Sequence, residues 1–205
     1  TIPTYLWILT NKKSKDRKGN IQIINATSFS TDLKKNLGNK GDMGHVFHST
    51  TLIGNPNFKE LQDYIGATSH NLLEEMGFTL KEHQVFITEL WVQEFAKKGG
   101  GHHSAHIHWN QHVSGFYFLK CSDKTSYPIF HEPRTGARCT KLILKPELKG
   151  IFLGSELIHF RPKPGTLIIF PGYLEHEYAV DHGIAPFRFI HWNITAILKE
   201  MAKDV

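Results

Sequence analysis

Cysteine is scarce in this chain, and long apolar runs are missing from it. The 205 residues include only two cysteines, Cys121 and Cys139, which excludes a disulfide-rich secreted scaffold and a cysteine-rich zinc module. No stretch approaches the roughly 18 apolar residues that a membrane-spanning helix requires. The first residues, TIPTYLWILTNKKSKDR, carry their charges after their apolar run, the reverse of a secretory signal. These absences predict a cytoplasmic globular protein with no membrane partner, of a length that suits one good-sized domain.

Acidic residues are scarce at one end of the chain. The whole chain has 24 Lys and Arg against 19 Asp and Glu, a formal net charge of +5. Residues 1–41 alone carry a formal net charge of +6, so the remaining 164 residues carry a net charge of −1. The composition changes at Asp42. We therefore predict a basic N-terminal segment over 1–41, with two strands joined by a charged loop, and a separate main domain over 42–205.

The basic segment also has a resemblance of its own. The stretches TYLWILTNKKSKDRKGNIQIINAT and KKNLGNK resemble part of the modification subunit of type I restriction systems. The chain has neither the glycine-rich cofactor loop nor the Asn-Pro-Pro-aromatic motif of such an N6-adenine methyltransferase, so methylation is not expected. Two interpretations stay open. Residues 1–41 form either a solvated basic hairpin or a nucleic-acid contact that is salt-dependent and lost on their deletion.

The rest of the chain changes from helical to strand-like texture. Apolar residues over 57–77 have helical spacing, with Asn55 or Asn57 as a cap, Gly77 as a stop and Gly66 as a point that could divide the helix. Short aromatic or β-branched runs then predict strands over 85–96, 112–119, 140–145, 165–170 and 187–194, with a closing helix over 195–203. This order predicts a mainly β fold with flanking helices, a double-sheet jelly roll.

Histidine is abundant, with 14 residues that are unevenly distributed. In the segment GHHSAHIHWNQH, His106 and His108 are two residues apart, so in extended backbone their side chains share a face. Two adjacent imidazoles offer two metal ligands, and a third must come from elsewhere. His176 is the best candidate, because Pro171 and Gly172 turn the chain just after an apolar strand. His191 is interpreted as an ordinary strand histidine.

Arg188 is an unusual residue for its surroundings. It lies within FRFIHWNI, where burial of a guanidinium is costly unless an anion meets it. Its planar fork suits a carboxylate. That carboxylate could belong to a ligand, or to Glu132 or Glu175 in a salt bridge, and an edge-strand arginine that faces water is a third interpretation.

Four segments together resemble a known family. HIHWNQHVSGFYFL, FHEPRTG, PGTLIIFPGYLEHEY and FRFIHWNI resemble the 2-oxoglutarate and iron(II)-dependent oxygenases, above all a prolyl-hydroxylase-like, phage-type branch. The resemblance covers about residues 42–205 and implies a double-stranded β-helix. It implies that His106 and His176 bind Fe(II), that Arg188 binds the far carboxylate of 2-oxoglutarate, and that Tyr117 is a second anchor.

One position departs from the family pattern. The wider family has an acidic residue where this chain has His108, so the third ligand is either His108 or a carboxylate such as Glu132 from FHEPR. We favour His108 because of its spacing, since Glu132 and Arg134 are close enough in sequence to pair with each other.

The resemblance implies a dioxygenase that uses Fe(II), 2-oxoglutarate and dioxygen to hydroxylate a substrate, with a peptide side chain favoured, and releases succinate and CO2. The rival enzyme is a cupin-type metalloprotein in which the same three histidines bind iron, manganese or zinc without 2-oxoglutarate. At this stage Arg188 is the residue that discriminates between the two.

Overall fold

The computed structural model describes residues 7–9, 34–35, 45–139, 142–147 and 150–204. Strands make up most of this part of the chain. One group comprises β1 (Trp7–Leu9), β2 (Lys34–Lys35), β3 (Val46–His48), β4 (His83–Phe95), β6 (Val113–Lys120), β9 (Leu167–Pro171) and β11 (Arg188–Leu198). The other comprises β5 (His103–His106), β7 (Pro128–His131), β8 (Leu157–His159) and β10 (His176–Tyr178). The helices are α1 (Lys59–Glu75), α2 (Thr135–Cys139) and 3-10 turns at Pro56–Phe58 and Met201–Asp204.

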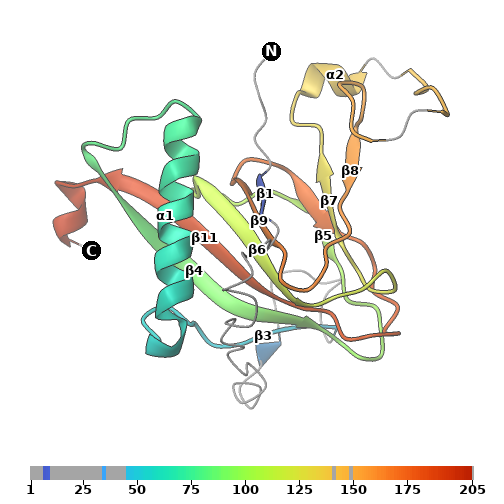
Figure 1. Cartoon of the computed structure of the whole chain (residues 1–205), viewed down its shortest axis with the longest axis horizontal. Helices are drawn as coiled ribbons and strands as arrows, with labels where there is room; N and C mark the ends of the chain where they lie inside the picture. The colour runs from blue at the N-terminus through green and yellow to red at the C-terminus, as the bar shows by residue number, and fades with distance from the viewer. Residues whose placement is uncertain (1–6, 10–33, 36–44, 140–141, 148–149, 205) are drawn as a thin grey trace, which may run out of the picture.

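These strands form two antiparallel sheets. The larger has the order β1-β9-β6-β11-β4-β3-β2 and the smaller the order β5-β10-β7-β8. The long helix α1 lies across the larger sheet, over β4 and β11 (Figure 1). A mainly β jelly roll with a flanking helix is the fold that the sequence predicts, and the structure confirms it.

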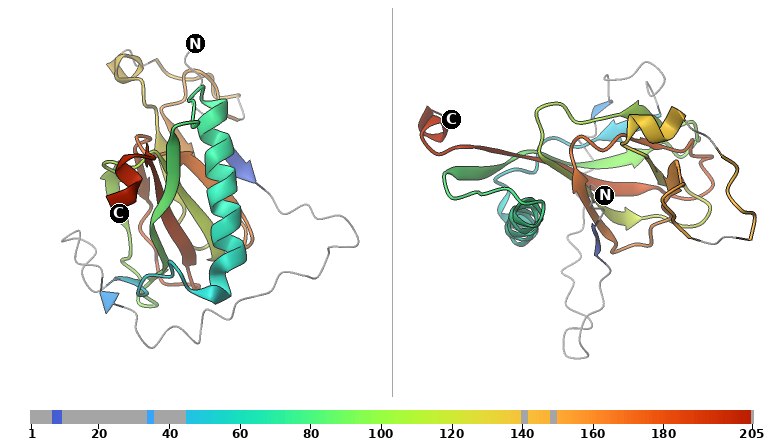
Figure 2. Two further views of the ribbon diagram at one scale, coloured as in Figure 1. Left: turned by 90° about the vertical axis from the view of Figure 1, so that its left-hand side faces the viewer. Right: turned by 90° about the horizontal axis from the view of Figure 1, so that it is seen from above.

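The larger sheet separates two layers of apolar side chains. Strand β11 illustrates the division, because successive side chains of a strand point to opposite faces. Ile190 and Trp192 pack in the layer beneath α1, whereas Phe187 and Phe189 pack in the layer between the two sheets. Figure 2 shows α1 alongside one face of the larger sheet. On β11, therefore, even-numbered residues point to the α1 side of the sheet and odd-numbered residues to the side of the smaller sheet.

The predicted helix over 57–77 is confirmed in position, but Gly66 does not divide it. α1 runs without a break from Lys59 to Glu75, after an N-terminal turn in which the side chain of Asn55 accepts a hydrogen bond from the backbone N–H of Asn57. The helix buries Ile65 and Leu72 against the larger sheet. Because tertiary packing supplies most helical stability, one glycine with low helix propensity is tolerated in its middle.

Two sequence predictions are wrong. Residues 142–145, predicted as a strand with 140–141, have no regular structure, and Ile143 is fully exposed with no strand beside it. The predicted closing helix over 195–203 is instead the end of β11, which continues to pair with β4 as far as Leu198, and only Met201–Asp204 forms a short 3-10 turn. Apolar texture alone does not distinguish a paired strand from an exposed loop.

The basic N-terminal segment lies mostly outside the described residues. Its described pieces, β1 and β2, pair with β9 and β3 respectively. The domain boundary after residue 41 and a nucleic-acid contact through 1–41 stay predictions. Within the described part of the chain, no helix is both long enough and apolar enough to cross a bilayer.

Gly115 permits the closest approach between strands at the centre of the larger sheet. A Cβ atom built there would lie 2.2 Å from Cζ2 of the buried Trp192 and 2.7 Å from the backbone oxygen of Ile168. We expect Gly115→Ala to lower the free energy of unfolding by about 3 kcal/mol, the upper part of the usual range for overpacking. Gly66→Ala is the matched control, because a Cβ there meets nothing within 4 Å. It should stabilise the protein by about 0.5–1 kcal/mol. Equal effects of the two substitutions in urea unfolding would contradict this packing.

Candidate metal centre

The structure brings the three predicted histidines together. His106 ends β5, His108 follows two residues later, and His176 begins β10, directly opposite His106 in the register of those strands. One ligand nitrogen from each of the three lies within 4.8 Å of the other two. The backbone N–H of His108 donates to the carbonyl oxygen of Gly172 at 2.9 Å, so the Pro-Gly turn before His176 also holds the loop that carries His108.

Two of the three rings are held at Nδ1 by backbone carbonyl oxygens. Nδ1 of His106 lies 2.7 Å from the carbonyl oxygen of Ser104, and Nδ1 of His176 lies 2.9 Å from that of Leu174. A carbonyl oxygen only accepts, so each Nδ1 carries the proton and each Nε2 keeps a lone pair. Nε2 of His108 lies 3.3 Å from Nε2 of His176. Hydrogen bonds from Nδ1 to a backbone carbonyl, as in His106 and His176, are a usual way in which proteins orient a histidine that binds a metal through Nε2.

The surroundings keep the imidazoles of His108 and His176 neutral. Burial, followed by the neighbouring imidazoles, holds the pKa of His108 far below its ordinary value of 6.5, and burial likewise lowers the pKa of His176. Rings of Phe116, Phe130 and Phe170 surround His176, with centroids 5.6, 5.9 and 4.8 Å from its own. Neutral imidazole is the form that binds a metal, so three nitrogen donors face one point at the edge of an apolar layer.

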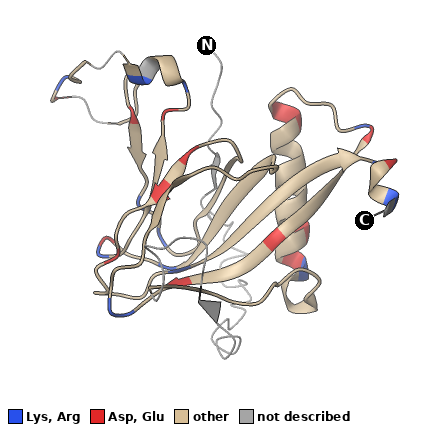
Figure 3. Ribbon diagram, turned by 180° about the vertical axis from the view of Figure 1, so that it is seen from behind, with Lys and Arg blue, Asp and Glu red and all other residues tan. Residues whose placement is uncertain are grey.

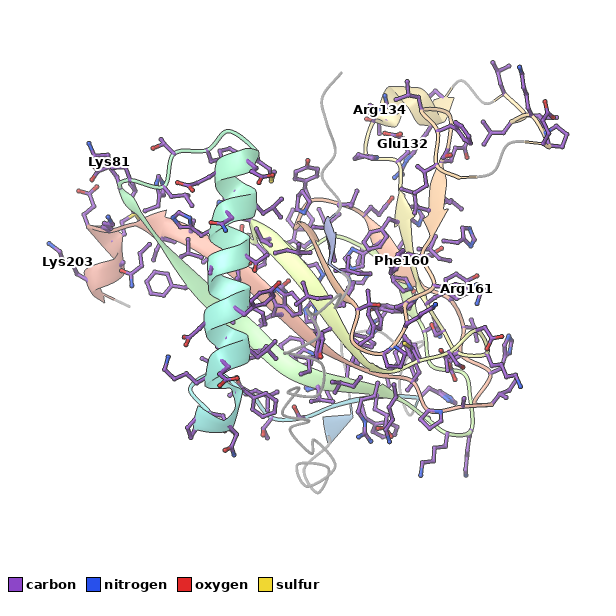
Figure 4. All side chains as sticks on the ribbon, viewed as in Figure 1. Lys81, Glu132, Arg134, Phe160, Arg161 and Lys203 are labelled. Carbon is purple, nitrogen blue, oxygen red and sulfur yellow. The ribbon has the colours of Figure 1, made fainter. Side chains whose placement is uncertain are left out.

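Glu132, the alternative third ligand, does not belong to this group. Its carboxylate accepts two hydrogen bonds from Arg134, from Nε and Nη2, at 2.7 Å each. Figure 4 shows both side chains at the α2 end of the molecule. The structure thus confirms the pairing of Glu132 with Arg134, and the described metal-ligand groups do not include Glu132.

Glu132→Gln is therefore expected to leave the metal content of the protein unchanged. The variant should be slightly less stable at neutral pH, because the hydrogen bonds from Arg134 lower the pKa of Glu132. The stability from this pair is present above the ordinary pKa of 4.5 and is lost as pH falls through the lowered one. The difference in stability between wild type and variant should accordingly vanish in acid. Loss of bound metal in this variant would restore Glu132 as a ligand.

Arg188 does not reach the three histidines. Its guanidinium forms an ion pair with Glu94 on the neighbouring strand β4, with contacts from both Nε and Nη2 to Oε2. Arg188 lies between Phe187 and Phe189, which both pack between the sheets, so alternation directs its side chain to the other face. The predicted role of Arg188 as an anchor for 2-oxoglutarate thus has no support in this geometry. Its salt-bridge partner is also neither Glu132 nor Glu175.

Tyr117, the predicted second anchor, lies on the same face of the larger sheet as Arg188. It packs against the layer beneath α1, whereas its neighbours Phe116 and Phe118 are buried in the layer that contains His176. Among the described residues, the buried polar side chains include no lysine or arginine. Figure 3 shows lysine and arginine mainly in loops and at the ends of elements. No lysine or arginine among the described residues is thus fully buried in the layer of the three histidines.

Glu89, His191 and Asn193 lie beside the centre although the sequence predicts no role in the site for them, and His191 is interpreted from the sequence as an ordinary strand histidine. Nδ2 of Asn193 donates to a carboxylate oxygen of Glu89 and lies 3.1 Å from Nδ1 of His108. The ring of His191 stacks on His108 with a centroid distance of 5.1 Å. A signal for them was present, since His191 and Asn193 alternate with Ile190 and Trp192. That pattern places two polar side chains on the face opposite to α1.

A family model agrees with this geometry. Residues 89–185, a little under half of the chain, match the model described as "Putative 2OG-Fe(II) oxygenase". This segment is therefore similar to the 2OG-Fe(II) oxygenases. Fe(II) and 2-oxoglutarate are the cofactors typical of this family. The matched residues include all three histidines of the centre. No curated protein matches the chain.

Solved structures share the fold of this chain. The epimerase SnoN from nogalamycin biosynthesis has a TM-score of 0.65 and 9% identity over 95% of this chain and 81% of its own. A prolyl hydroxylase from Trichoplax adhaerens has a TM-score of 0.60 and 12% sequence identity, over 97% of this chain and 86% of its own. A prolyl-4-hydroxylase from Pseudomonas putida has a TM-score of 0.55 and 9% sequence identity, over 94% of this chain and 93% of its own. At these identities the likeness concerns the fold alone.

The described residues fit the two cofactors unequally. Iron(II) suits the centre, because imidazole nitrogen is among the ligands that it binds well and three are oriented toward one point. For 2-oxoglutarate the fit is incomplete, since none of the described lysines or arginines is fully buried in the layer around His176, where it could meet the far carboxylate. No binding step for that carboxylate is therefore assigned to a residue of this chain.

Proposed function

We propose that His106, His108 and His176 bind Fe(II), and that this enzyme uses it with 2-oxoglutarate and dioxygen to hydroxylate a C–H bond of its substrate. The observation that carries the proposal is the convergence of the three histidines inside the family-matched segment. Bound iron would supply the redox chemistry that side chains cannot. The overall reaction would release succinate and CO2.

The chain's own part is to position and shield the metal. The carbonyl oxygens of Ser104 and Leu174 fix the rings of His106 and His176, so little reorganisation is needed when the metal binds. The aromatic layer around His176 keeps water from that side of the centre. Three protein ligands leave further coordination positions for small molecules.

A peptide side chain is the substrate class that we favour. The Trichoplax adhaerens enzyme is a prolyl hydroxylase in complex with a peptide fragment of the hypoxia-inducible factor oxygen degradation domain. The second likeness is to a prolyl-4-hydroxylase. Both supports come from the fold, so the substrate class is tested separately from the cofactors.

The cofactor proposal is tested by anaerobic titration of the protein with Fe(II) and then with 2-oxoglutarate. We expect a visible charge-transfer band that saturates at one equivalent of 2-oxoglutarate, and succinate formation once oxygen is admitted. His106→Ala should remove the band, whereas His159→Ala, at an exposed histidine on β8, should keep it. Absence of the band in folded wild-type protein with bound iron would overturn the use of 2-oxoglutarate.

A cupin-type metalloprotein is the second candidate, and one observation favours it. Among the described residues, three metal ligands come together, whereas no lysine or arginine is fully buried in their layer as an anchor for an oxoacid. This candidate predicts retained iron, manganese or zinc with no band on addition of 2-oxoglutarate. The same titration separates the two candidates, which Arg188, on the far face of the sheet, cannot do.

A further inference from the structure

A second set of metal-ligating side chains lies next to the first. Glu89 from β4 and His191 from β11 join His108 in a group whose ligand atoms all lie within 4.8 Å of one another. Only His108 is common to both groups, because His106 and His176 lie on its other side. The second group has two imidazoles and one carboxylate, a donor set that suits Fe(II), Co(II) or Zn(II).

The spacing of Glu89 and His191 suits a shared cation better than a direct bond. Nε2 of His191 lies 3.7 Å from a carboxylate oxygen of Glu89, which is beyond hydrogen-bond length. Nitrogen and oxygen atoms that bind one cation tetrahedrally, each at about 2.0–2.2 Å, are about 3.4 Å apart.

Asn193 lies beside this group and has one unpaired buried polar atom. The residue is 2% exposed, and its Oδ1 is buried without a hydrogen-bond partner, while Nδ2 faces Glu89 and Nδ1 of His108. Buried polar atoms are normally paired, so an orphaned oxygen requires an explanation. If the amide turns over, Oδ1 faces the same two groups. In that orientation the amide oxygen of Asn193 faces the carboxylate of Glu89. The two repel each other when nothing lies between them, whereas a cation between them attracts both.

His108 is placed to serve both groups. Its Nε2 lies 3.3 Å from Nε2 of His176, and its Nδ1 lies on the opposite edge of the ring, 3.1 Å from Nδ2 of Asn193. His106 and His176 instead have Nδ1 bonded to backbone carbonyls, which leaves each of them one nitrogen for a metal. His108 is thus the one ligand of the three with no backbone carbonyl on its second nitrogen among the described contacts.

We propose that Glu89, His191 and Nδ1 of His108 form a second divalent-cation site beside the three-histidine centre. Asn193 lies beside it, and its amide oxygen can complete the donor set. When both sites are filled, His108 bridges the two cations through its two nitrogens. A neutral imidazole has one N–H, so this bridging breaks that N–H bond and releases one proton to solvent for each chain. The site does not depend on the use of 2-oxoglutarate.

The test is metal stoichiometry on the purified full-length chain, stripped of metal and equilibrated with Co(II) by dialysis. We expect two ions per folded chain in wild type and in His159→Ala. Glu89→Gln and His191→Gln should each retain one, as should His106→Ala, whereas His108→Ala should weaken both sites. The d–d absorption of bound Co(II) gives a second readout of the same losses.

One ion per chain in wild type would overturn the second site, as would two ions in Glu89→Gln. Because His191 is buried and its substitution could unfold the protein, Glu89→Gln, at a partly exposed side chain, decides the matter if His191→Gln does not fold. A single ion that is lost in His106→Ala and gives the charge-transfer band with 2-oxoglutarate would overturn this site alone. Two ions without the band would overturn only the proposed use of 2-oxoglutarate.

Discussion

Replacing His176 by alanine is expected to abolish retention of iron at the three-histidine centre and, with it, formation of succinate. His176 is fully buried, with Nδ1 held by the carbonyl of Leu174, so its Nε2 is the most rigidly placed of the three donors. Loss of a group that merely orients a ligand costs about 10–100-fold in metal affinity or activity. Loss of the ligand itself should exceed that range. Iron content after gel filtration and succinate yield measure the two effects.

The burial of His176 calls for controls on folding. An alanine there leaves a void among Phe116, Phe130 and Phe170, which costs stability as well as a ligand. His176→Gln keeps more of the volume, and His106→Ala removes a less buried ligand of the same centre. His159→Ala should behave as wild type. If the His176 and His106 variants fold and retain iron as wild type does, the proposed ligand set is wrong.

The proximity of the three histidines could be predicted because it depends on local rules. His106 and His108 are two residues apart, so a nearly extended chain turns both to one side, and the Pro171–Gly172 turn presents His176 at a strand start. The pairing of β5 with β10 then sets His176 opposite His106. None of this requires knowledge of which distant residues fill the layers above and below the sheet.

The opposite holds for Arg188, whose environment depends on residues far away in sequence. The sequence gives the spacing between His176 and Arg188, but it does not give the face of the sheet to which the side chain of Arg188 points. That face is fixed by Phe187 and Phe189, which the layer between the sheets buries, and by Glu94, 94 residues earlier, which supplies the carboxylate. The contacts of Asn193 with Glu89 and with His108 escaped prediction for the same reason, since they join residues 104 and 85 positions apart.

Replacing Arg188 by methionine should destabilise the protein without weakening its hold on 2-oxoglutarate. The side chains of Arg188 and Glu94 are only 12% and 16% exposed, so loss of one partner leaves the other as a nearly buried, unpaired charge. Breaking such a pair costs about 3–5 kcal/mol. For a chain of this size that lowers Tm by roughly 6–20 °C. Chemical unfolding and the 2-oxoglutarate titration, done well below the lowered Tm, measure the two quantities.

A double-substitution cycle separates the structural role of Arg188 from binding of a ligand. Glu94→Gln alone should destabilise the protein by a similar amount, because it leaves the nearly buried guanidinium of Arg188 without a charged partner. The double variant Arg188→Met/Glu94→Leu should recover most of the loss, since two apolar side chains extend the layer beneath α1 in which Val92 and Ile190 already pack. A 2-oxoglutarate anchor behaves otherwise. Its loss would raise the dissociation constant tenfold or more, the stability would change little, and no substitution of Glu94 would compensate.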